Sequence, residues 1–213
     1  MILYTVNKGK YYNIADYDSH KGMKVYVNLT NRCSCNCTFC LRQTKQMLEN
    51  NTLWLKEEPS VKQIIDEFDK YDINEFEEII FCGFGEPLIR NDDVIKVAKY
   101  LKERDPNCSI RVNTNGLSSL SNKRDITKDF KGVLDTISVS LNATTKEEYF
   151  QMTRSSFGID SFDEMLDFAK KAKKTSKKVV LTVVDIIGEQ KIKQCQKIAD
   201  DLGVHLRVRP FEK

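Results

Sequence analysis

The stretch MKVYVNLTNRCSCNCTFC (residues 23–40) combines a strand pattern with a cluster of cysteines. Its first seven residues are rich in β-branched and apolar side chains, as buried strands are. Four thiols then follow closely, at Cys33, Cys35, Cys37 and Cys40. Inside cells thiols stay reduced, so clustered cysteines indicate metal binding or catalysis more than disulfides. We therefore expect a first strand that leads into a metal-binding loop.

Further strand patterns alternate with helical patterns along the chain. The other strands are expected at 77–83, 109–114, 135–141, 177–185 and 204–210. The helices between them are expected at 60–71, 91–104, 161–174 and 189–203. Such alternation predicts βαβ units and a parallel sheet. Six units are too few for an eight-fold barrel, which leaves a doubly wound open sheet or a partial (β/α)6 TIM-like barrel.

The ends of these elements carry local signals. Ser60 is a plausible N-cap, and Ser161 with Glu164 forms a capping-box pattern before the third helix. Residues 1–22 are expected to form a small hairpin that turns at NKGK. Since no linker is long enough to divide the chain, we expect one domain over residues 1–213.

Composition limits the classes of function. The 213 residues are 40% hydrophobic, and the net charge is only +3, which does not indicate a nucleic-acid binder. No signal-peptide pattern opens the sequence, and the longest apolar run (179–187) is too short to span a bilayer, so we expect a cytoplasmic protein. Two histidines are too few for a zinc site with three histidine ligands.

Unusual residues follow four successive strands. GFGEP (83–87), NTNG (113–116) and SLNA (140–143) lie at the expected strand ends, as the cysteine cluster does. Ligands of parallel α/β sheets bind at the carboxyl ends of the strands. We therefore expect these four segments to form one site.

The spacing of the thiols bears on the metal. A zinc site with four cysteine ligands usually takes two separated CxxC pairs, and this sequence has no second pair. Cys33, Cys37 and Cys40 form C-x3-C-x2-C, which suits the larger iron–sulfur cluster. If only three thiols bind, one iron keeps an open position, as catalytic metals do.

With these motifs the chain resembles the radical S-adenosylmethionine (SAM) superfamily, and it looks most like the small TatD-associated radical SAM proteins. The resemblance implies that Cys33, Cys37 and Cys40 hold a [4Fe–4S] cluster, whose open iron SAM chelates through its amino and carboxylate groups. One electron then cleaves SAM to methionine and a 5′-deoxyadenosyl radical, which takes a hydrogen atom from a substrate.

The resemblance also implies contacts from the surrounding loops to SAM. Phe39, the aromatic residue between the last two ligands, is expected near the adenine. Backbone of Gly85 and the Glu86 region is expected to receive the amino group, because glycine lets backbone approach a ligand closely. GFGEP departs from the commoner GGEP in that Phe84 replaces a glycine, which puts the local geometry in question.

Polar residues of the later strand ends complete the expected SAM site. Asn113, Ser140 and Asn142 are implied to contact the ribose or the methionine carboxylate, and amides and hydroxyls are suitable partners for a diol. Arg154 resembles an arginine that binds this carboxylate in related enzymes, through its forked guanidinium. Asn115 alone could mark only a turn, but in this company we assign it to the site.

The resemblance implies a low-potential electron donor, such as a flavodoxin or ferredoxin, and no auxiliary cluster. The substrate could be a small molecule enclosed by the hairpin and loop 41–59. It could instead be a protein partner, as for activases of glycyl-radical enzymes. A non-catalytic iron–sulfur electron carrier is a third hypothesis, but it would have no use for the SAM motifs.

Cys35 should be a non-ligand that points away from the cluster. Three further features have two readings each. Cys82 is either a small buried side chain or a thiol that faces the substrate. The lysine-rich stretch 170–178 is either a solvated helix end or a dock for an acidic donor or RNA. Trp54 either covers the site or anchors a loop.

Overall fold

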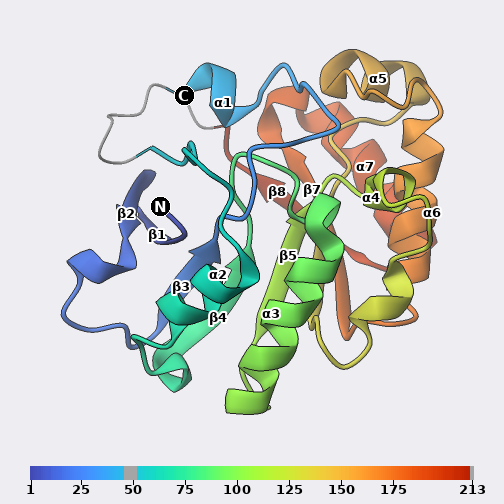
Figure 1. Cartoon of the computed structure of the whole chain (residues 1–213). Coiled ribbons are helices and arrows are strands. Elements are labelled where there is room, and N and C mark those ends of the chain that lie inside the picture. Colours follow the sequence, from blue (N-terminus) through green and yellow to red (C-terminus); the bar gives the residue numbers. More distant parts are fainter. Residues whose placement is uncertain (46–51, 212–213) are drawn as a thin grey trace.

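Eight strands form a single sheet in the computed structural model, which describes residues 1–45 and 52–211 (Figure 1). The strands are β1 (Leu3–Asn7), β2 (Lys10–Asn13), β3 (Met23–Val27), β4 (Phe76–Phe81), β5 (Ile110–Thr114), β6 (Thr136–Ser140), β7 (Lys178–Val184) and β8 (His205–Arg209). Their order is β2-β1-β3-β4-β5-β6-β7-β8, and neighbours from β3 to β8 pair in parallel. A doubly wound sheet would reverse its strand order, so the prediction of a partial (β/α)6 barrel is confirmed.

Helices connect the parallel strands. They are α1 (Leu41–Thr44), α2 (Val61–Phe68), α3 (Asn91–Arg104), α4 (Ser118–Ser121), α5 (Lys146–Thr153), α6 (Ser161–Ala172) and α7 (Glu189–Leu202). Short 3-10 turns are η1 (Ile14–Asp16), η3 (Ile73–Glu75), η4 (Pro87–Arg90), η5 (Thr127–Phe130) and η6 (Asp185–Ile187). Helices α2, α3, α6 and α7 match the predicted ones, whereas α1, α4 and α5 were not predicted.

The two faces of the sheet differ in polarity. Val27, Phe81 and Val139 are buried in the main core, to which the helices contribute. Side chains alternate along a strand, so their neighbours point to the other, concave face. That face carries polar side chains such as Glu78 and Arg111. The strands are therefore buried on one face, and the concave face is free to bind a polar ligand.

The structure confirms one of the two expected helix caps. Ser60 accepts a hydrogen bond from the Gln63 N–H in a full capping box, and Gly203 ends α7 with a φ of 62°. The capping box at Ser161 is wrong. Asp160 occupies the N-cap position, and the Ser161 hydroxyl instead donates to the Gly158 carbonyl, 2.6 Å away.

The N-terminal hairpin is confirmed and extends the sheet. Lys8 (φ 48°) and Gly9 (φ 72°) occupy its turn, and two successive positive φ angles are typical of a type I′ hairpin turn. β1 also pairs antiparallel with β3, through Leu3 and Val27. The hairpin therefore covers the edge of β3.

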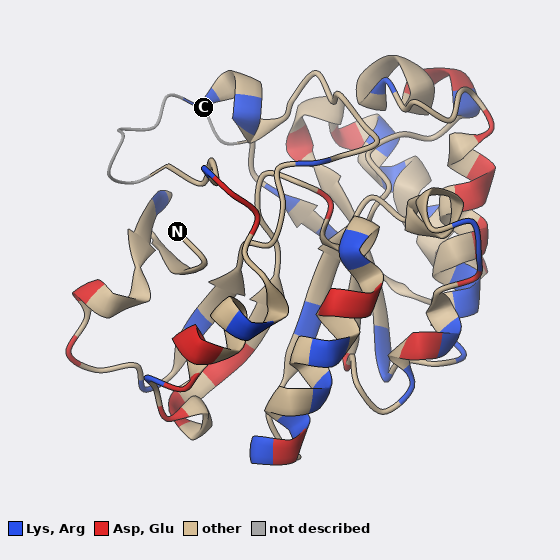
Figure 2. Ribbon diagram, viewed as in Figure 1, with Lys and Arg blue, Asp and Glu red and all other residues tan. Residues whose placement is uncertain are grey.

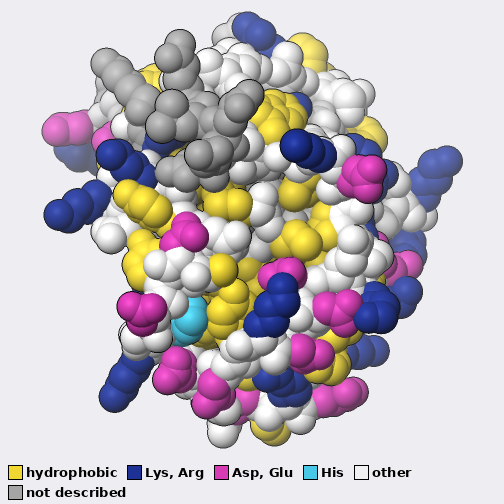
Figure 3. All heavy atoms as spheres, turned by 60° about the vertical axis from the view of Figure 1, so that its left-hand side comes forward, with side chains coloured by type: hydrophobic (Ala, Val, Ile, Leu, Met, Phe, Trp, Pro, Cys, Tyr) yellow, Lys and Arg dark blue, Asp and Glu magenta, His cyan; other side chains and the backbone are white. Residues whose placement is uncertain are grey.

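The outer helices α3 and α6 carry charges of both signs, with acidic residues in the first turn and basic residues in the last (Figure 2). The hairpin side likewise mixes acidic, basic and apolar side chains over the part that the structure describes (Figure 3). Within residues 1–45 and 52–211, no helix is both long and apolar enough to cross a membrane.

Candidate functional site

The cysteine loop (residues 33–40) follows β3 at the C-terminal edge of the sheet. Three of its thiol side chains are half-buried, at Cys33, Cys37 and Cys40. Cys35 is only 8% exposed and packs in the main core. The three predicted ligands are therefore open to a bound group, whereas Cys35 is largely enclosed.

Cys35 lies between two of these thiols. Its N–H donates to Cys33 Sγ at 3.4 Å, and its thiol hydrogen-bonds with Cys33 and Cys37. The bond with Cys33 lowers the pKa of Cys35, but the bond with Cys37 and burial outweigh it and raise the pKa to about 12. Burial also raises the pKa of Cys40. In the structure Cys35 therefore lies beside the other thiols, and its assignment as a non-ligand that points away from the cluster stays a prediction.

The end of α5 supports the cysteine loop. The Asn36 N–H donates to the Thr153 carbonyl and the Thr38 N–H to the Met152 carbonyl, each at 2.9 Å. Arg154 follows directly, exposed and in the left-handed conformation (φ 47°). Its guanidinium therefore belongs to a segment that borders the cysteines. The resemblance to related enzymes indicated Arg154, but no sequence signal indicated the backbone pairing.

Asn115 connects the end of β5 to the cysteine loop. Its side-chain amide donates to Ser34 Oγ at 3.2 Å and to Cys35 Sγ at 3.5 Å, and it lies 3.8 Å from Cys33 Sγ. The side-chain oxygen of Asn115, Oδ1, accepts a hydrogen bond from the Leu117 N–H at 2.9 Å. Asn115 therefore forms a turn and contacts the thiols at once.

Glu86 is a buried carboxylate that joins two of the motifs. It accepts hydrogen bonds from Thr114 Oγ1 and the Asn115 N–H, both at 2.7 Å, and from the Leu88 N–H at 3.1 Å. Burial raises the pKa of Glu86, while these hydrogen bonds oppose that shift. The bond from Leu88 makes Glu86 the N-cap of η4.

Gly83 and Gly85 allow close contact between two loops. A Cβ on Gly85 would lie 2.3 Å from the Thr30 carbonyl oxygen, and a Cβ on Gly83 would lie 2.1 Å from Asn28 Oδ1. The Glu86 N–H also donates to the Arg32 carbonyl at 2.7 Å. GFGEP therefore packs directly against the segment that leads into Cys33.

Phe84 does not disturb this contact. Its side chain is 6% exposed and packs in a second apolar cluster with Tyr4, Tyr11 and Leu53. The ring of Trp54 lies edge-on at 5.0 Å. The residue that departs from GGEP thus anchors the hairpin and the segment after residue 51 to the site.

Trp54 also borders a hollow of about 130 Å³ beside the cysteines. The hollow is lined by Cys35, Asn36, Cys40, Arg42, Gln43 and Trp54. The Arg42 guanidinium lies 4.8 Å over the Trp54 ring, a cation–π contact. Trp54 therefore anchors the loop and forms one wall of the site. Part of loop 41–59, expected to enclose a substrate, lies outside the described residues.

An ion pair fixes the approach to Cys33. Arg32 donates from Nε and Nη2 to the two oxygens of Glu58, at 2.9 and 2.8 Å. Thr30 Oγ1 donates to the same carboxylate. Although burial opposes the shift, Arg32 and Thr30 lower the pKa of Glu58. This bidentate pair holds residues 30–32 against the crossover segment.

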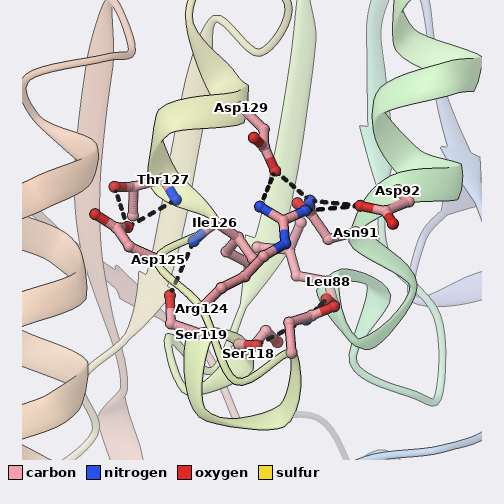
Figure 4. Close-up of polar contacts among 11 residues, drawn as sticks. Leu88, Asn91, Asp92, Ser118, Ser119, Arg124, Asp125, Ile126, Thr127 and Asp129 are labelled. Atoms are coloured by element: carbon pink, nitrogen blue, oxygen red, sulfur yellow. Dashed lines mark hydrogen bonds and ion pairs between the residues drawn. The ribbon is translucent and has the colours of Figure 1, made fainter.

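A second polar network supports the site from outside (Figure 4). Arg124 bridges Asp92 and Asp129, each at 2.7 Å. Asn122 donates to the Leu88 carbonyl at 2.9 Å. These contacts tie the segment after NTNG to the segment after GFGEP, so the two motifs are held together on both sides.

Asn113 and Phe39 occupy different surroundings. Asn113 hydrogen-bonds with the Cys82 thiol, whose pKa is raised by burial. Cys82 therefore shares the concave face with Asn113 rather than packing in the core. Phe39 is half-buried in the cysteine loop.

Ser140 and Asn142 differ in their availability to a ligand. Ser140 is half-buried at the end of β6. Asn142 is 2% exposed with a φ of 54°, and its side-chain oxygen accepts the Val184 N–H at 3.1 Å. In the structure Asn142 thus holds the end of β7.

The thiols suit a group larger than one ion. Among residues 1–45 and 52–211, no three His, Cys, Asp or Glu side chains converge tightly enough to bind a single metal ion. Three half-buried cysteines on one loop still offer their sulfurs to a cubane, whose irons are spread in space. The donor set, all thiols and no histidine, is the set that iron–sulfur clusters use.

Comparison with known sequences decides the family. A profile of the Radical SAM superfamily matches residues 27–202, which include the cysteines and every other predicted site residue. The chain belongs to the radical SAM superfamily. Radical SAM proteins use a [4Fe–4S] cluster and SAM, with an electron donor and a substrate.

Named relatives are more distant. The chain is 27% identical over 177 residues to a GTP 3′,8-cyclase of Limosilactobacillus fermentum, which covers 81% of this chain and 49% of that protein. It is 26% identical over 185 residues to an uncharacterized protein of Methanocaldococcus jannaschii, covering 84% and 55%. The chain thus spans about half the length of the curated relatives it matches.

Solved structures share the fold. SuiB of Streptococcus suis bound to S-adenosylmethionine superposes with a TM-score of 0.65 at 15% identity, over 91% of this chain and 40% of SuiB. A radical SAM methyltransferase from Sphaerobacter thermophilus gives 0.60 at 13% identity, over 99% and 76%. The open α/β sheet of this chain is therefore a radical SAM fold.

Proposed function

We propose that this chain carries out reductive cleavage of SAM, with a [4Fe–4S] cluster held by Cys33, Cys37 and Cys40. One observation supports it above the others. Glu86 and Asn115 join the cysteine loop, GFGEP and NTNG into one connected structure at the C-terminal edge of the sheet. A non-catalytic electron carrier would need the cysteines but not this assembly.

The cluster would supply one electron to the sulfonium of SAM, giving methionine and a 5′-deoxyadenosyl radical that abstracts hydrogen from the substrate. The chain's own residues would position SAM. Arg154, exposed beside the cysteine loop, suits the methionine carboxylate. Backbone at Gly85 is the proposed partner of the amino group, and the packing of Gly85 against the Thr30 and Arg32 carbonyls would fix the position of that backbone.

The remaining roles follow from exposure. Phe39 and Trp54 are aromatic surfaces for the adenine, and both are partly open. Asn113 and Ser140 suit the ribose or carboxylate from the concave side. Glu86 and Asn142 act by holding loops, since their oxygens already accept hydrogen bonds within the chain.

From the named relatives we extend only the superfamily chemistry, because identity is 27% and about half of their length is matched. The closer likeness to small TatD-associated radical SAM proteins stays a prediction. Four further points also stay predictions: the single domain, the flavodoxin or ferredoxin donor, the cytoplasmic location, and the choice between a small substrate and a protein partner.

The experiment is anaerobic reconstitution of the cluster, reduction with dithionite, addition of SAM and measurement of 5′-deoxyadenosine. We expect product from the wild type and none from Cys37→Ala. A wild type with a confirmed [4Fe–4S] cluster and no product would overturn the proposal.

A further inference from the structure

A hollow of about 360 Å³ lies on the concave face of the sheet, distinct from the cysteine loop. Strands β4 to β8 line it, with Glu78, Arg111, Ser138, Lys178, His205 and Arg207 among its residues. Arg111 and Ser138 precede Asn113 and Ser140 by two residues on the same strand faces. The register places Arg111 and Lys178 level with Thr136, and Arg207 level with Ser140. The hollow therefore extends along the concave face up to the level of the expected SAM contacts.

The charge of this hollow is unbalanced. Glu78 pairs with Arg111 at 2.7 Å, and both side chains are largely buried. Lys178 and Arg207 have no carboxylate partner among the described residues. Arg209 lies two residues beyond Arg207, so it projects from the same face of β8. Within the described part of the chain, the hollow thus carries cations that no acidic side chain neutralises.

Two guanidinium nitrogens here also lack acceptors. Nε of Arg111 and Nε of Arg209 are buried and have no hydrogen-bond partner in the part of the chain that is described. A buried donor without an acceptor lowers stability, so such donors are usually satisfied. An acceptor brought by a ligand would satisfy them.

Arg111, Arg207 and Arg209 lie close enough to Tyr26 and Cys82 to affect their pKa values. The pKa of Tyr26 on β3 is raised by burial and by Cys82, while Arg111 and Arg207 act against that shift. Arg209 likewise lowers the pKa of Cys82, which burial raises. Cations from β5 and β8 therefore act on side chains of β3 and β4, on the opposite side of the concave face.

We propose that this hollow binds the anionic end of the substrate, a phosphate or carboxylate group, through Arg207 and Arg209, which are neighbours on the same face of β8. Forked guanidiniums match the geometry of both oxyanions. An anion held by Arg207 would lie at the level of Ser140, so the rest of the molecule would stay close to the expected SAM contacts. As a substrate site the hollow rests on the proposed function, but its affinity for anions does not.

Binding is tested by anaerobic isothermal titration of the reconstituted protein without SAM, using inorganic pyrophosphate in one arm and glutarate in the other. Visible absorption of the cluster is followed throughout, since pyrophosphate also binds iron. The variants are Arg207→Gln, Arg209→Gln and Arg207→Lys. The control is Lys197→Gln on the outer, exposed face of α7, which removes the same charge.

We expect at least one anion to bind one site per chain, with Kd raised about tenfold in Arg207→Gln and Arg209→Gln. Arg207→Lys should fall between them and the wild type, and Lys197→Gln should match the wild type. Tighter pyrophosphate indicates a phosphorylated substrate, and tighter glutarate a carboxylic acid. If neither anion binds, or if Lys197→Gln weakens binding as much as Arg207→Gln, the inference is overturned.

The 5′-deoxyadenosine assay on the same preparation separates the two proposals. Product without anion binding overturns the anion site and leaves SAM cleavage standing. Anion binding without product overturns the proposed function and, with it, the role of the hollow as a substrate site.

Discussion

The two ends of the parallel sheet are built from similar polar residues but put them to different use. At the C-terminal end, Glu86 and Asn115 bond to the backbone and thiols of other loops, and their loops are the ones that carry the superfamily motifs. At the N-terminal end, Asp135 pairs with Lys102 and Lys177 at 2.8 and 2.6 Å. The first arrangement shapes a site, whereas the second only stabilises the fold, a division typical of TIM-like barrels.

The lysine-rich stretch 170–178 belongs to the second kind. Lys171 pairs with Asp167 at 2.5 Å, and Lys173 donates to the Leu202 carbonyl at 2.9 Å. Lys177 is the partner of Asp135. These contacts match a structural helix end and strand start. Lys178 differs, because it lines the hollow on the concave face.

The largest effect should come from the cysteine loop. Cys37→Ala should abolish iron and sulfide incorporation, because it removes a ligand from the proposed set of three. Cys35→Ala should keep the cluster, at the stability cost of a small buried side chain. Iron and sulfide analysis after reconstitution measures both, and equal loss in the two variants would refute the ligand assignment.

A methyl group at Gly85 should affect the C-terminal end far more than one at the N-terminal end. Gly85→Ala places Cβ against the Thr30 carbonyl, which should lower the free energy of unfolding by about 2–3 kcal/mol. It should also remove most of the SAM cleavage. The control, Gly132→Ala just before β6, meets no atom within 4 Å but has a φ of 74°. It should cost about 1–2 kcal/mol and leave 5′-deoxyadenosine yield per cluster unchanged.

Denaturant unfolding and product assays on both variants test this contrast. If Gly132→Ala lost as much product per cluster as Gly85→Ala, the two ends would not differ in the way we describe.

Asp135 should give the N-terminal end a pH-dependent stability. Burial acts to raise its pKa, but hydrogen bonds from Lys102, Lys177 and the Ile110 N–H outweigh burial and lower it. The folded state therefore gains stability from this carboxylate above its ordinary pKa and loses it as pH falls through the lowered pKa. Asp135→Asn should cost about 2 kcal/mol at neutral pH and flatten the decline below about pH 5.

Urea unfolding at a series of pH values measures this effect. SAM cleavage per folded molecule should be unchanged at neutral pH. A variant whose stability kept the wild-type dependence on pH would show that other carboxylates dominate.

The smallest effect should come from the pair of Arg32 and Glu58. Both side chains are partly exposed, so Glu58→Gln should cost only about 0.5–1 kcal/mol. Because the pair holds the segment before Cys33, cluster incorporation should fall more than stability does. Iron content per protein measures cluster incorporation, and the midpoint of urea unfolding measures stability, each relative to the wild type. Unchanged iron content would show that the cysteine loop does not depend on this pair.

Much of the fold could be predicted because its signals are local. β-Branched runs located β3 to β8, and the sequence Asn7–Lys10 located the hairpin turn. Helix α5 was missed, because it shows no clear apolar stripe: one of its two buried residues is the polar Thr153, and its large apolar residue Phe150 is exposed. Ser161 matched a capping box, but its hydroxyl found a nearer acceptor in the Gly158 carbonyl.

The site was predictable in its residues and not in their partners. The positions of the motifs after successive strands predicted that Glu86, Asn115 and the cysteines lie at one edge of the sheet. Hydrogen bonds between segments, however, decide what each side chain does. Glu86 is occupied by donors from β5, about 28 residues away in sequence. The polar concave face was also missed, because strands rich in Val and Ile look buried on both faces even when Arg111 or Ser138 alternates with them.

The most direct test of the account is the electron paramagnetic resonance spectrum of the reduced cluster with and without SAM. If Cys33, Cys37 and Cys40 leave one iron open, addition of SAM should change the spectrum of the wild type and of Cys35→Ala alike. A confirmed [4Fe–4S] cluster whose spectrum is the same with and without saturating SAM would contradict the central claim that the missing fourth ligand is the place where SAM binds.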